Sequence, residues 1–282
     1  MNIVKRAIFG GIYVALIVAS LLLWDTCKWM FVLLFAAFIV LGMNEASKLL
    51  NYDGSKTSPL IKVVDALGGI ALFTAFFVYY NFPSAKWLPL TLVAAYLLIR
   101  LTAQLYMPAR NAIADVRQSL GALVYVALPI AMLNTIADVS PRIVLAMFVF
   151  IWLNDTGAFL VGCAIGKHRL FERISPKKSW EGVFGGAAFV IAAAIAIACV
   201  SWLSKTFNPS GFGIATWIAL GVATVVASTL GDLFESLLKR TAGVKDSGNI
   251  IPGHGGILDR IDSLLFVALA TVIILQIATA IQ

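Results

Sequence analysis

The sequence predicts an all-α fold, a polytopic bundle of about nine transmembrane helices with its N-terminus in the cytoplasm. Of its 282 residues, 61% are hydrophobic and only 12% are charged, and the mean hydropathy is +0.94. Soluble domains contain roughly 45–50% apolar and about 25% charged residues, so a water-soluble enzyme and a disordered chain are both excluded. The apolar runs are continuous, which favours helices over the alternating strands of a membrane barrel.

Nine apolar runs meet or approach the length of a membrane span. A helix needs about 20 apolar residues to cross a bilayer, with a range of roughly 17–25. We expect a single integral membrane domain over residues 1–282, in which residues 1–140 form spans and residues 141–282 add the polar loops of a candidate site. The expected spans are residues 7–24, 29–43, 65–80, 87–105, 120–136, 143–165, 183–203, 213–231 and 263–281.

The basic residues fix the orientation of these spans. Nine crossings place all but four of the 21 Lys and Arg residues on the side of the N-terminus, the exceptions being Lys28, Lys86, Arg142 and Lys205. Because cytoplasmic loops carry an excess of Lys and Arg, the N-terminus is expected in the cytoplasm. The net charge of +7 is then a property of the cytoplasmic face. It suits anionic lipid headgroups and anionic substrates, and no nucleic acid is expected as a partner.

The first unexpected polar region covers residues 151–186. Asn154 and Asp155 interrupt an apolar span, where a charge costs about 2.5–3.5 kcal/mol and therefore faces a partner or a watery cavity. A structural hydrogen bond between helices is the alternative. Downstream, Ser175, Lys177 and Lys178 lie in a predicted loop that could bind phosphates. The alternative for this loop is an ordinary basic cytoplasmic connection.

The second polar region begins in the eighth span. Five polar residues stand at helical offsets 0, +3, +4, +7 and +8 and therefore share one face of a helix. A polar face at the end of a membrane helix should turn to a cavity and not to lipid. These residues are Asp232, Glu235, Ser236, Lys239 and Arg240.

A turn and a glycine-rich loop follow this helix. Residues 243–248 are typical of a turn, and residues 252–256, Pro-Gly-His-Gly-Gly, form a loop whose bare backbone can approach a phosphate closely. His254 could be a general acid, a phosphate donor or a residue that shapes the loop by hydrogen bonding. The sequence leaves these three roles open.

Two further carboxylates open the last span. Asp259 and Asp262 are three residues apart, so they point the same way if the segment is helical. Together with the acids of the eighth span they form a set of hard oxygen ligands of the kind Mg²⁺ prefers. The neighbouring lysines and arginines suit phosphate oxygens. A charged loop with mutually neutralising ion pairs is the alternative.

The segment from Ser236 to Asp262, SLLKRTAGVKDSGNIIPGHGGILDRID, resembles the signature of the phosphatidate cytidylyltransferases (CDP-diacylglycerol synthases). That signature is a serine followed by Lys-Arg, Lys-Asp, His-Gly-Gly and Asp-Arg-x-Asp. The upstream NDTGAF and SPKKSWEGVFGG segments also look like the family, whereas the first 140 residues match only as generic spans. One departure is Cys163, where many relatives have arginine, so that a basic contact is missing or moved to Lys167 or Arg169.

The resemblance implies a reaction of CTP with phosphatidic acid that yields CDP-diacylglycerol and pyrophosphate, a step of phospholipid biosynthesis. It implies Mg²⁺ as cofactor with a second cation, monovalent or divalent. It further implies a multi-pass protein of the bacterial inner (plasma) membrane, with its active site facing the cytoplasm. Relatives form homodimers, but no contact face can be identified in this sequence.

The resemblance also assigns roles to residues. It implies Asp232, Asp259 and Asp262 as metal ligands. Asp246 would hold the basic turn or bind a second metal. The expected catalytic set is Asp232, Lys239, Arg240, Asp246, Asp259 and Asp262. The expected substrate contacts are Asp155, Ser175, Lys177, Lys178, Ser236, Lys245, His254, Gly255, Gly256 and Arg260.

Three other functions remain open at this point. A CTP-dependent polyprenol or dolichol kinase would use similar groups to transfer the γ-phosphoryl group. An ion-coupled transporter would use Asp155, Asp232 and Glu235 as a relay, and a catalytically inactive homologue would retain the signature alone. If the assignment to a cytidylyltransferase is right, Asn at position 232 or 259 abolishes turnover while folding and insertion persist.

Overall fold

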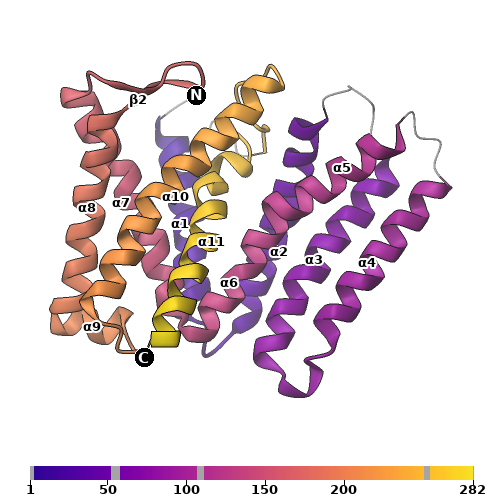
Figure 1. Cartoon of the computed structure of the whole chain (residues 1–282), viewed down its shortest axis with the longest axis horizontal. Helices are drawn as coiled ribbons and strands as arrows, with labels where there is room; N and C mark the ends of the chain where they lie inside the picture. The colour runs from indigo at the N-terminus through magenta and orange to yellow at the C-terminus, as the bar shows by residue number, and fades with distance from the viewer. Residues whose placement is uncertain (1–2, 52–57, 107–110, 251–254, 282) are drawn as a thin grey trace. The chain divides into compact units, whose positions relative to one another are not determined.

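A computed structural model describes residues 3–51, 58–106, 111–250 and 255–281, with side chains from residue 8 onward. Helices dominate the described chain (Figure 1). The elements in chain order are α1 (Ile3–Leu22), α2 (Lys28–Leu50), α3 (Pro59–Asn81), η1 (Pro83–Ala85), α4 (Leu88–Leu105), α5 (Ala112–Ala122), η2 (Leu123–Ala127), α6 (Leu128–Val139), α7 (Pro141–Ile165), β1 (Arg169–Phe171), β2 (Ser175–Ser179), α8 (Trp180–Cys199), α9 (Ser201–Phe207), α10 (Ile214–Thr241) and α11 (Leu258–Ile281).

Eight helical segments in the described residues are long and apolar enough to cross a membrane, with α5, η2 and α6 counted together as Ala112–Val139. The chain is therefore a multi-pass integral membrane protein, as the composition predicts. The first expected span corresponds to α1, of which Ile8–Leu22 counts as a shorter apolar helix. A ninth crossing by α1 stays a prediction.

Several predicted span boundaries were wrong. The span expected at residues 29–43 is α2, Lys28–Leu50, because the polar residues at its end, such as Glu45 and Ser47, are buried within protein and do not terminate the helix. The span expected at residues 183–203 stops at Cys199, since Val200 is extended and α9 then begins.

The described chain divides into two compact units, and each takes segments from distant parts of the sequence. Unit 1 comprises Met1–Thr135 and Leu238–Ile261, and unit 2 comprises Ile136–Leu237 and Asp262–Gln282. The expectation of one integral membrane domain over residues 1–282 stays a prediction. Because the unit boundaries cut α10 and α11, each unit holds part of the signature segment.

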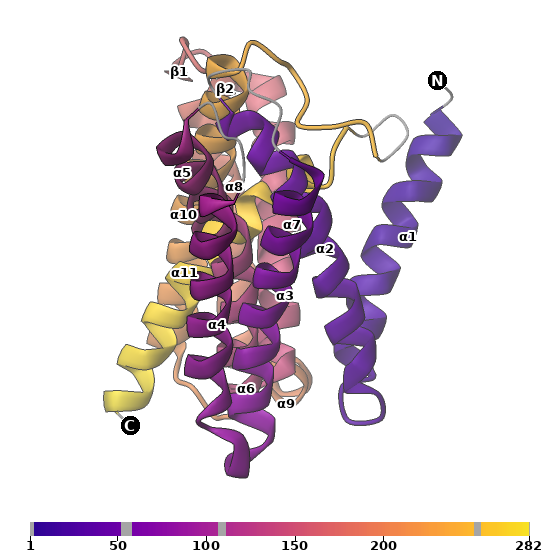
Figure 2. The same ribbon diagram turned by 90° about the vertical axis from the view of Figure 1, so that its right-hand side faces the viewer.

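Unit 1 is built around α2 and α3. In Figure 2, α1 joins α2 through a tight connection and leans away from it, while α3 and α4 run side by side. Phe31 of α2 packs against Phe35 of the same helix and against Phe73 of α3, and all three side chains are fully buried. This aromatic core fixes α2, which carries a buried carboxylate near its C-terminal end.

A buried charged network ties α3, α4 and α5 together in unit 1. The Arg100 side chain on α4 is only 1% exposed, and its Nε lies 3.2 Å from Oδ1 of Asp65 on α3. Ser119 of α5 accepts a hydrogen bond from Arg100 Nε and donates one to Asp65 Oδ2. Tyr96 donates a further hydrogen bond to Asp65 Oδ1. Charges within membrane helices need such partners, so this network fixes how the three helices pack.

We expect Arg100→Met to destabilise the protein strongly, because it leaves the Asp65 carboxylate without its counter-charge. Breaking a buried ion pair from one side costs about 3–5 kcal/mol. The measurement is the thermal denaturation midpoint in detergent at a fixed scan rate. The double variant Arg100→Met/Asp65→Leu, which removes both charges, should recover much of the loss. Equal midpoints for wild type and Arg100→Met would contradict a stabilising role for the network.

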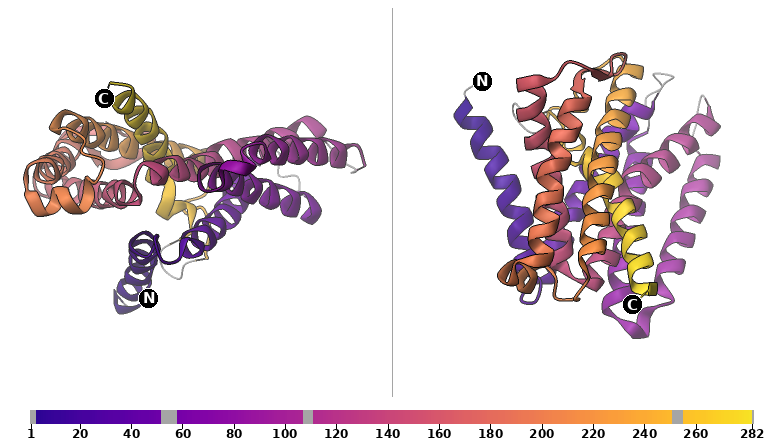
Figure 3. Two further views of the ribbon diagram at one scale, coloured as in Figure 1. Left: turned by 90° about the horizontal axis from the view of Figure 1, so that it is seen from below. Right: turned by 60° about the vertical axis from the view of Figure 1, so that its left-hand side comes forward.

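Unit 2 is built around the antiparallel pair α7 and α8, with α10 alongside, as Figure 3 shows. Glycines allow close packing of the pair: a Cβ at Gly185 of α8 would overlap Val161 of α7. Small residues that let helix backbones touch are typical of membrane interfaces. The pairing brings Asn154, in the middle of α7, against Gly186 of α8.

The connection between α7 and α8, where the sequence predicted a loop, contains two short strands. It is an antiparallel hairpin in which Arg169 of β1 pairs with Ser179 of β2. His168 and Glu181 close its base, since the His168 backbone N–H lies 3.2 Å from the Glu181 carboxylate and the ring nitrogen lies 2.6 Å from it. Ser179 then caps α8 by accepting a hydrogen bond from the Gly182 backbone. The hairpin therefore holds its lysines in fixed positions.

Candidate active site

A pocket in unit 2 collects several of the polar residues that the sequence singles out. Its volume is about 400 Å³. Asp155 of α7, Lys177 and Lys178 of β2, and Asp232 of α10 all line it. Apolar side chains such as Phe159 form another part of the wall. The pocket thus offers bases for phosphate oxygens, carboxylates for a cation and apolar surface for a lipid.

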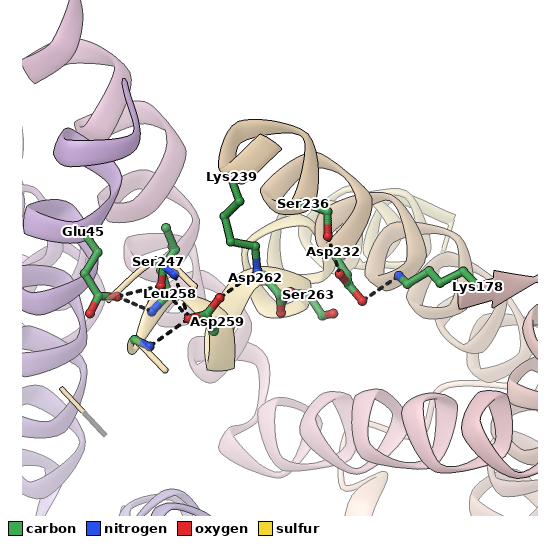
Figure 4. Close-up of polar contacts among 11 residues, drawn as sticks. Glu45, Lys178, Asp232, Ser236, Lys239, Ser247, Leu258, Asp259, Asp262 and Ser263 are labelled. Carbon is green, nitrogen blue, oxygen red and sulfur yellow. Dashed lines mark hydrogen bonds and ion pairs between the residues drawn. The ribbon is translucent and has the colours of Figure 1, made fainter. Parts of the chain in front are cut away.

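Lys178 and Asp232 form the charged centre of this pocket. Lys178 Nζ lies 2.6 Å from Asp232 Oδ2, and Figure 4 shows the lysine extending from β2 toward the carboxylate. Ser236, one turn further along α10, donates a hydrogen bond to Asp232 Oδ1 over 3.3 Å. The Asp232 side chain is 38% exposed and that of Lys178 25%. An ion pair this accessible can exchange partners when a phosphate or a cation enters.

Asn154 and Asp155, adjacent in sequence, have different tasks. Asn154 is buried, and its side-chain amide donates a hydrogen bond of 2.9 Å to Ser228 Oγ on α10. This is the structural interhelical bond that the sequence left open as an alternative. Asp155 is exposed and lines the pocket. The Asn154–Ser228 bond ties α7 to α10, the two helices that supply the pocket's carboxylates.

The crossing of α10 and α11 in unit 2 depends on Gly231. A Cβ at this position would lie 2.7 Å from the backbone oxygen of Asp262 and 3.2 Å from Cα of Ser263. Ser263 also donates a hydrogen bond to the backbone oxygen of Ser228. Glycine therefore lets α11 approach α10 at the residue next to Asp232. Asp262 is half-buried, and its Oδ1 accepts a hydrogen bond of 2.6 Å from the Ser263 backbone.

Unit 1 holds the other part of the signature, centred on Asp259. Lys239 Nζ lies 2.7 Å from Asp259 Oδ1, and both side chains are largely buried, at 12% and 9% exposed. Oδ2 of Asp259 accepts hydrogen bonds from the backbone and hydroxyl of Ser247, over 3.0 and 2.9 Å, and from the Gly256 backbone over 2.8 Å (Figure 4). Asp259 thereby joins the end of α10 and the turn to the start of α11.

Residues 4–278 match the sequence pattern of the cytidylyltransferase family. The chain belongs to this family. It is 48% identical to a phosphatidate cytidylyltransferase of Haemophilus influenzae over 126 residues, 43% of this chain and 41% of that protein. It is also 45% identical to the enzyme of the same name from Staphylococcus aureus over 126 residues, 44% of this chain and 45% of that protein. The chain thus spans less than half the length of these relatives.

The carboxylates of the unit 2 pocket, Asp155 and Asp232, suit part of the ligand shell of Mg²⁺. Mg²⁺ commonly uses one or two carboxylates and completes its shell with water and substrate phosphates. Asp232 fits this pattern, because it is accessible and shares its pocket with Asp155. Among the described residues, no group of three or more His, Cys, Asp or Glu side chains is placed to hold a metal by itself.

Asp259 fits a metal less well than the sequence predicted. One of its oxygens accepts three hydrogen bonds and the other pairs with Lys239. A cation could reach Oδ1 only if Lys239 moved to another anion, such as a substrate phosphate. The roles of Asp259 and Asp262 as ligands stay predictions.

Other predicted residues lie outside the pocket. Ser175 begins β2 and Glu235 is fully buried, so the polar face of α10 is only partly turned to a cavity. His254 lies outside the described residues. Gly255 adopts a positive φ of 82°, and the Gly256 backbone N–H donates a hydrogen bond to Asp259. Arg240, Lys245, Asp246 and Arg260 are exposed, and their phosphate roles stay predictions.

Sequence reasoning missed two features of these sites. Thr229 and Ser228 line the pocket one turn before Asp232, and an i, i+3 or i+4 count back from Asp232 could have found them. Glu45 of α2 contacts the signature segment over about 200 residues of sequence, through hydrogen bonds from Ser247 and Leu258. The only signal for it was a carboxylate near the end of an apolar run.

Proposed function

We propose that this chain transfers the cytidylyl group of CTP to phosphatidic acid, giving CDP-diacylglycerol and pyrophosphate. The observation that carries this proposal is the unit 2 pocket, where two lysines and two carboxylates meet an apolar wall in a member of the cytidylyltransferase family. A lipid phosphate and a nucleoside triphosphate are both anions that the two lysines can bind, and the acyl chains of the lipid need apolar surface.

In the proposed reaction, an oxygen of the lipid phosphate attacks the α-phosphorus of CTP. A new phosphorus–oxygen bond forms, and the bond between the α-phosphorus and the bridging oxygen breaks, so that pyrophosphate leaves with the electron pair. No protein nucleophile is required. Lys177 and Lys178 bind and orient the anionic groups, which lowers the repulsion between two polyanions. Lys178 can do so because its partner Asp232 is accessible to a competing cation.

We propose Mg²⁺ as the cofactor, held by Asp232 together with phosphate oxygens. Asp155 lines the same pocket, and Asp262 and Asp259 remain further candidates for this ion or for a second cation, monovalent or divalent. The metal would neutralise charge on the entering and leaving oxygens. The protein's own part is to place the Asp232 carboxylate beside Lys178 and Ser236.

We further propose that the N-terminus and the pocket face the cytoplasm of a bacterial inner membrane. The distribution of Lys and Arg supports this orientation, and the relatives from Haemophilus influenzae and Staphylococcus aureus are bacterial proteins. The bilayer supplies phosphatidic acid from one leaflet, and CTP arrives from the aqueous side. A homodimer remains part of the proposal by resemblance to the family.

The decisive experiment follows two labels in purified protein supplied with phosphatidic acid, CTP and Mg²⁺. Label from the cytidine ring should enter the lipid, and label from the γ-phosphate should leave as pyrophosphate. Transfer of γ-phosphate to a polyprenol or other lipid alcohol would instead indicate a kinase. If the protein releases no pyrophosphate when substrates are added but carries ions across vesicle membranes, a transporter would be favoured.

Cys163 offers a test that does not depend on turnover, because it lines the same pocket. In a Cys27→Ser/Cys199→Ser variant, we expect CTP with Mg²⁺ to slow alkylation of Cys163 by a maleimide several-fold. The matched control keeps only Cys199, which is exposed at the end of α8 and should react at one rate throughout. Alkylation of Cys163 that is unaffected by CTP and by phosphatidic acid would place substrates elsewhere.

A further inference from the structure

Glu45 of α2 is a fully buried carboxylate that the metal and phosphate chemistry does not use. Its side chain is 0% exposed, although α2 belongs to the part of the chain that the sequence described only as generic spans. A buried carboxylate is costly unless hydrogen bonds compensate it. The groups that donate hydrogen bonds to Glu45 therefore indicate its role.

Both hydrogen bonds to Glu45 come from the signature segment. The Leu258 backbone N–H donates to Glu45 Oε2 over 2.8 Å, and Ser247 Oγ lies 3.2 Å from the same oxygen (Figure 4). Leu258 is the first residue of α11, where backbone N–H groups have no partner within the helix. A carboxylate is also favoured there by the helix dipole. Glu45 thus caps α11 from a helix more than 200 residues earlier.

The same Ser247 hydroxyl connects Glu45 to Asp259. It lies 2.9 Å from Asp259 Oδ2, and a hydroxyl has one proton to share between the two carboxylates. Asp259 in turn pairs with Lys239. Glu45 therefore contacts two parts of the chain that hold the Asp259–Lys239 pair. One is Ser247, which bonds to Asp259, and the other is the start of α11, which carries Asp259.

Two glycines of the signature are explained by the space that Glu45 fills. A Cβ at Gly248 would overlap the Glu45 carboxylate, and a Cβ at Gly256 would overlap both that carboxylate and Ser247 Oγ. Neither glycine has a positive φ; in the described residues only Gly211, Gly243 and Gly255 do. Backbone conformation therefore does not require glycine at position 248, whereas close contact with Glu45 does.

We propose that Glu45 is a positioning residue for the proposed cytidylyl transfer, which fixes the Asp259–Lys239 pair by capping α11 and holding Ser247. This inference rests on the proposed function. It acts through hydrogen bonds accepted by a single oxygen, Oε2. A glutamine oxygen can accept the same two bonds, so we expect these hydrogen bonds to contribute more to positioning than the charge at position 45 does.

The first test compares Glu45→Ala, Glu45→Gln and, as matched control, Lys48→Ala, an exposed site one turn along α2. Loss of a supporting partner typically lowers activity by about 10–100-fold, and we expect this for Glu45→Ala, mostly in kcat and not in KM. Glu45→Gln and Lys48→Ala should keep most of the activity. A glutamine variant as inactive as the alanine variant, or an active alanine variant, would overturn the proposal.

The second test uses Gly248→Ala, which should lower activity in the wild-type background because its new methyl group meets the Glu45 carboxylate. In the Glu45→Ala background that obstacle is gone, and the same change should add no further loss, the non-additivity expected of contacting residues. Equal losses in both backgrounds would overturn the proposal.

Hydrogen exchange separates this inference from the proposed function. Exchange at the Leu258 amide should accelerate in Glu45→Ala and not in Glu45→Gln or Lys48→Ala, whatever reaction the protein performs. If wild-type protein fails to place cytidine in lipid but the exchange pattern holds, the proposed function fails and the positioning by Glu45 stands. If exchange at the Leu258 amide is unchanged in Glu45→Ala while the wild-type protein places cytidine in lipid, the positioning role of Glu45 fails and the proposed function stands.

Discussion

Asp232→Asn is expected to abolish cytidylyl transfer and to leave the fold intact. The amide keeps the shape of the side chain but carries no charge, so it binds a cation poorly and no longer balances Lys178, 2.6 Å away. Removing one electrostatic element of a catalytic site typically costs about 10²–10³-fold in kcat, and we expect at least that loss. The measurement is cytidine incorporation into lipid over a range of Mg²⁺ concentrations.

The fold should survive because the Asp232–Lys178 pair is accessible to solvent, at 38% and 25% exposed. Such pairs contribute about 0–1 kcal/mol, so the thermal denaturation midpoint should stay near that of wild type. Asp138→Asn, an exposed aspartate near the end of α6 outside the pocket, is the matched control and should retain full activity. Turnover at the wild-type rate in Asp232→Asn would remove this residue from the reaction.

Composition and periodicity predicted the helical membrane fold because lipid allows few alternatives to an apolar helix. The sequence predicted about nine spans, and the described residues contain eight helical segments long and apolar enough to cross a membrane. The C-terminal end of α2 was not predicted, because polar residues such as Glu45 are buried by packing against protein that lies far away in sequence. The β1–β2 hairpin was missed for a similar reason: its base is closed by His168 and Glu181, a tertiary contact and not a local propensity.

Residue type alone singled out several residues of the candidate site, whose chemical roles stay predictions. Asp232, Lys177 and Lys178 were expected near phosphates and a cation, and they share one pocket. Hydrogen bonding was not predictable, and it distinguishes two aspartates that the sequence treated alike. Asp232 accepts from one hydroxyl and pairs with an accessible lysine, whereas Asp259 is enclosed by Ser247, Gly256 and Lys239.

Asp259→Asn is therefore expected to lose both activity and stability, which differs from the sequence-based expectation that folding would persist. An asparagine has one acceptor oxygen and one NH₂ group. If the oxygen keeps the bonds from Ser247 and Gly256, the NH₂ group faces the Lys239 ammonium, and two donors then meet in a site only 9–12% exposed. Breaking a buried pair from one side costs about 3–5 kcal/mol. The thermal denaturation midpoint and cytidine incorporation measure the two losses.

The double variant Asp259→Asn/Lys239→Met separates the structural task of Asp259 from a direct catalytic one. It removes the buried ammonium together with the carboxylate, so no donor opposes the asparagine NH₂ group and the midpoint should return toward wild type. Activity should not return, because the charged pair that the family signature brings together at Lys239 and Asp259 is gone. A wild-type midpoint in Asp259→Asn alone would contradict the structural task, since three hydrogen bonds and an ion pair converge on that one carboxylate.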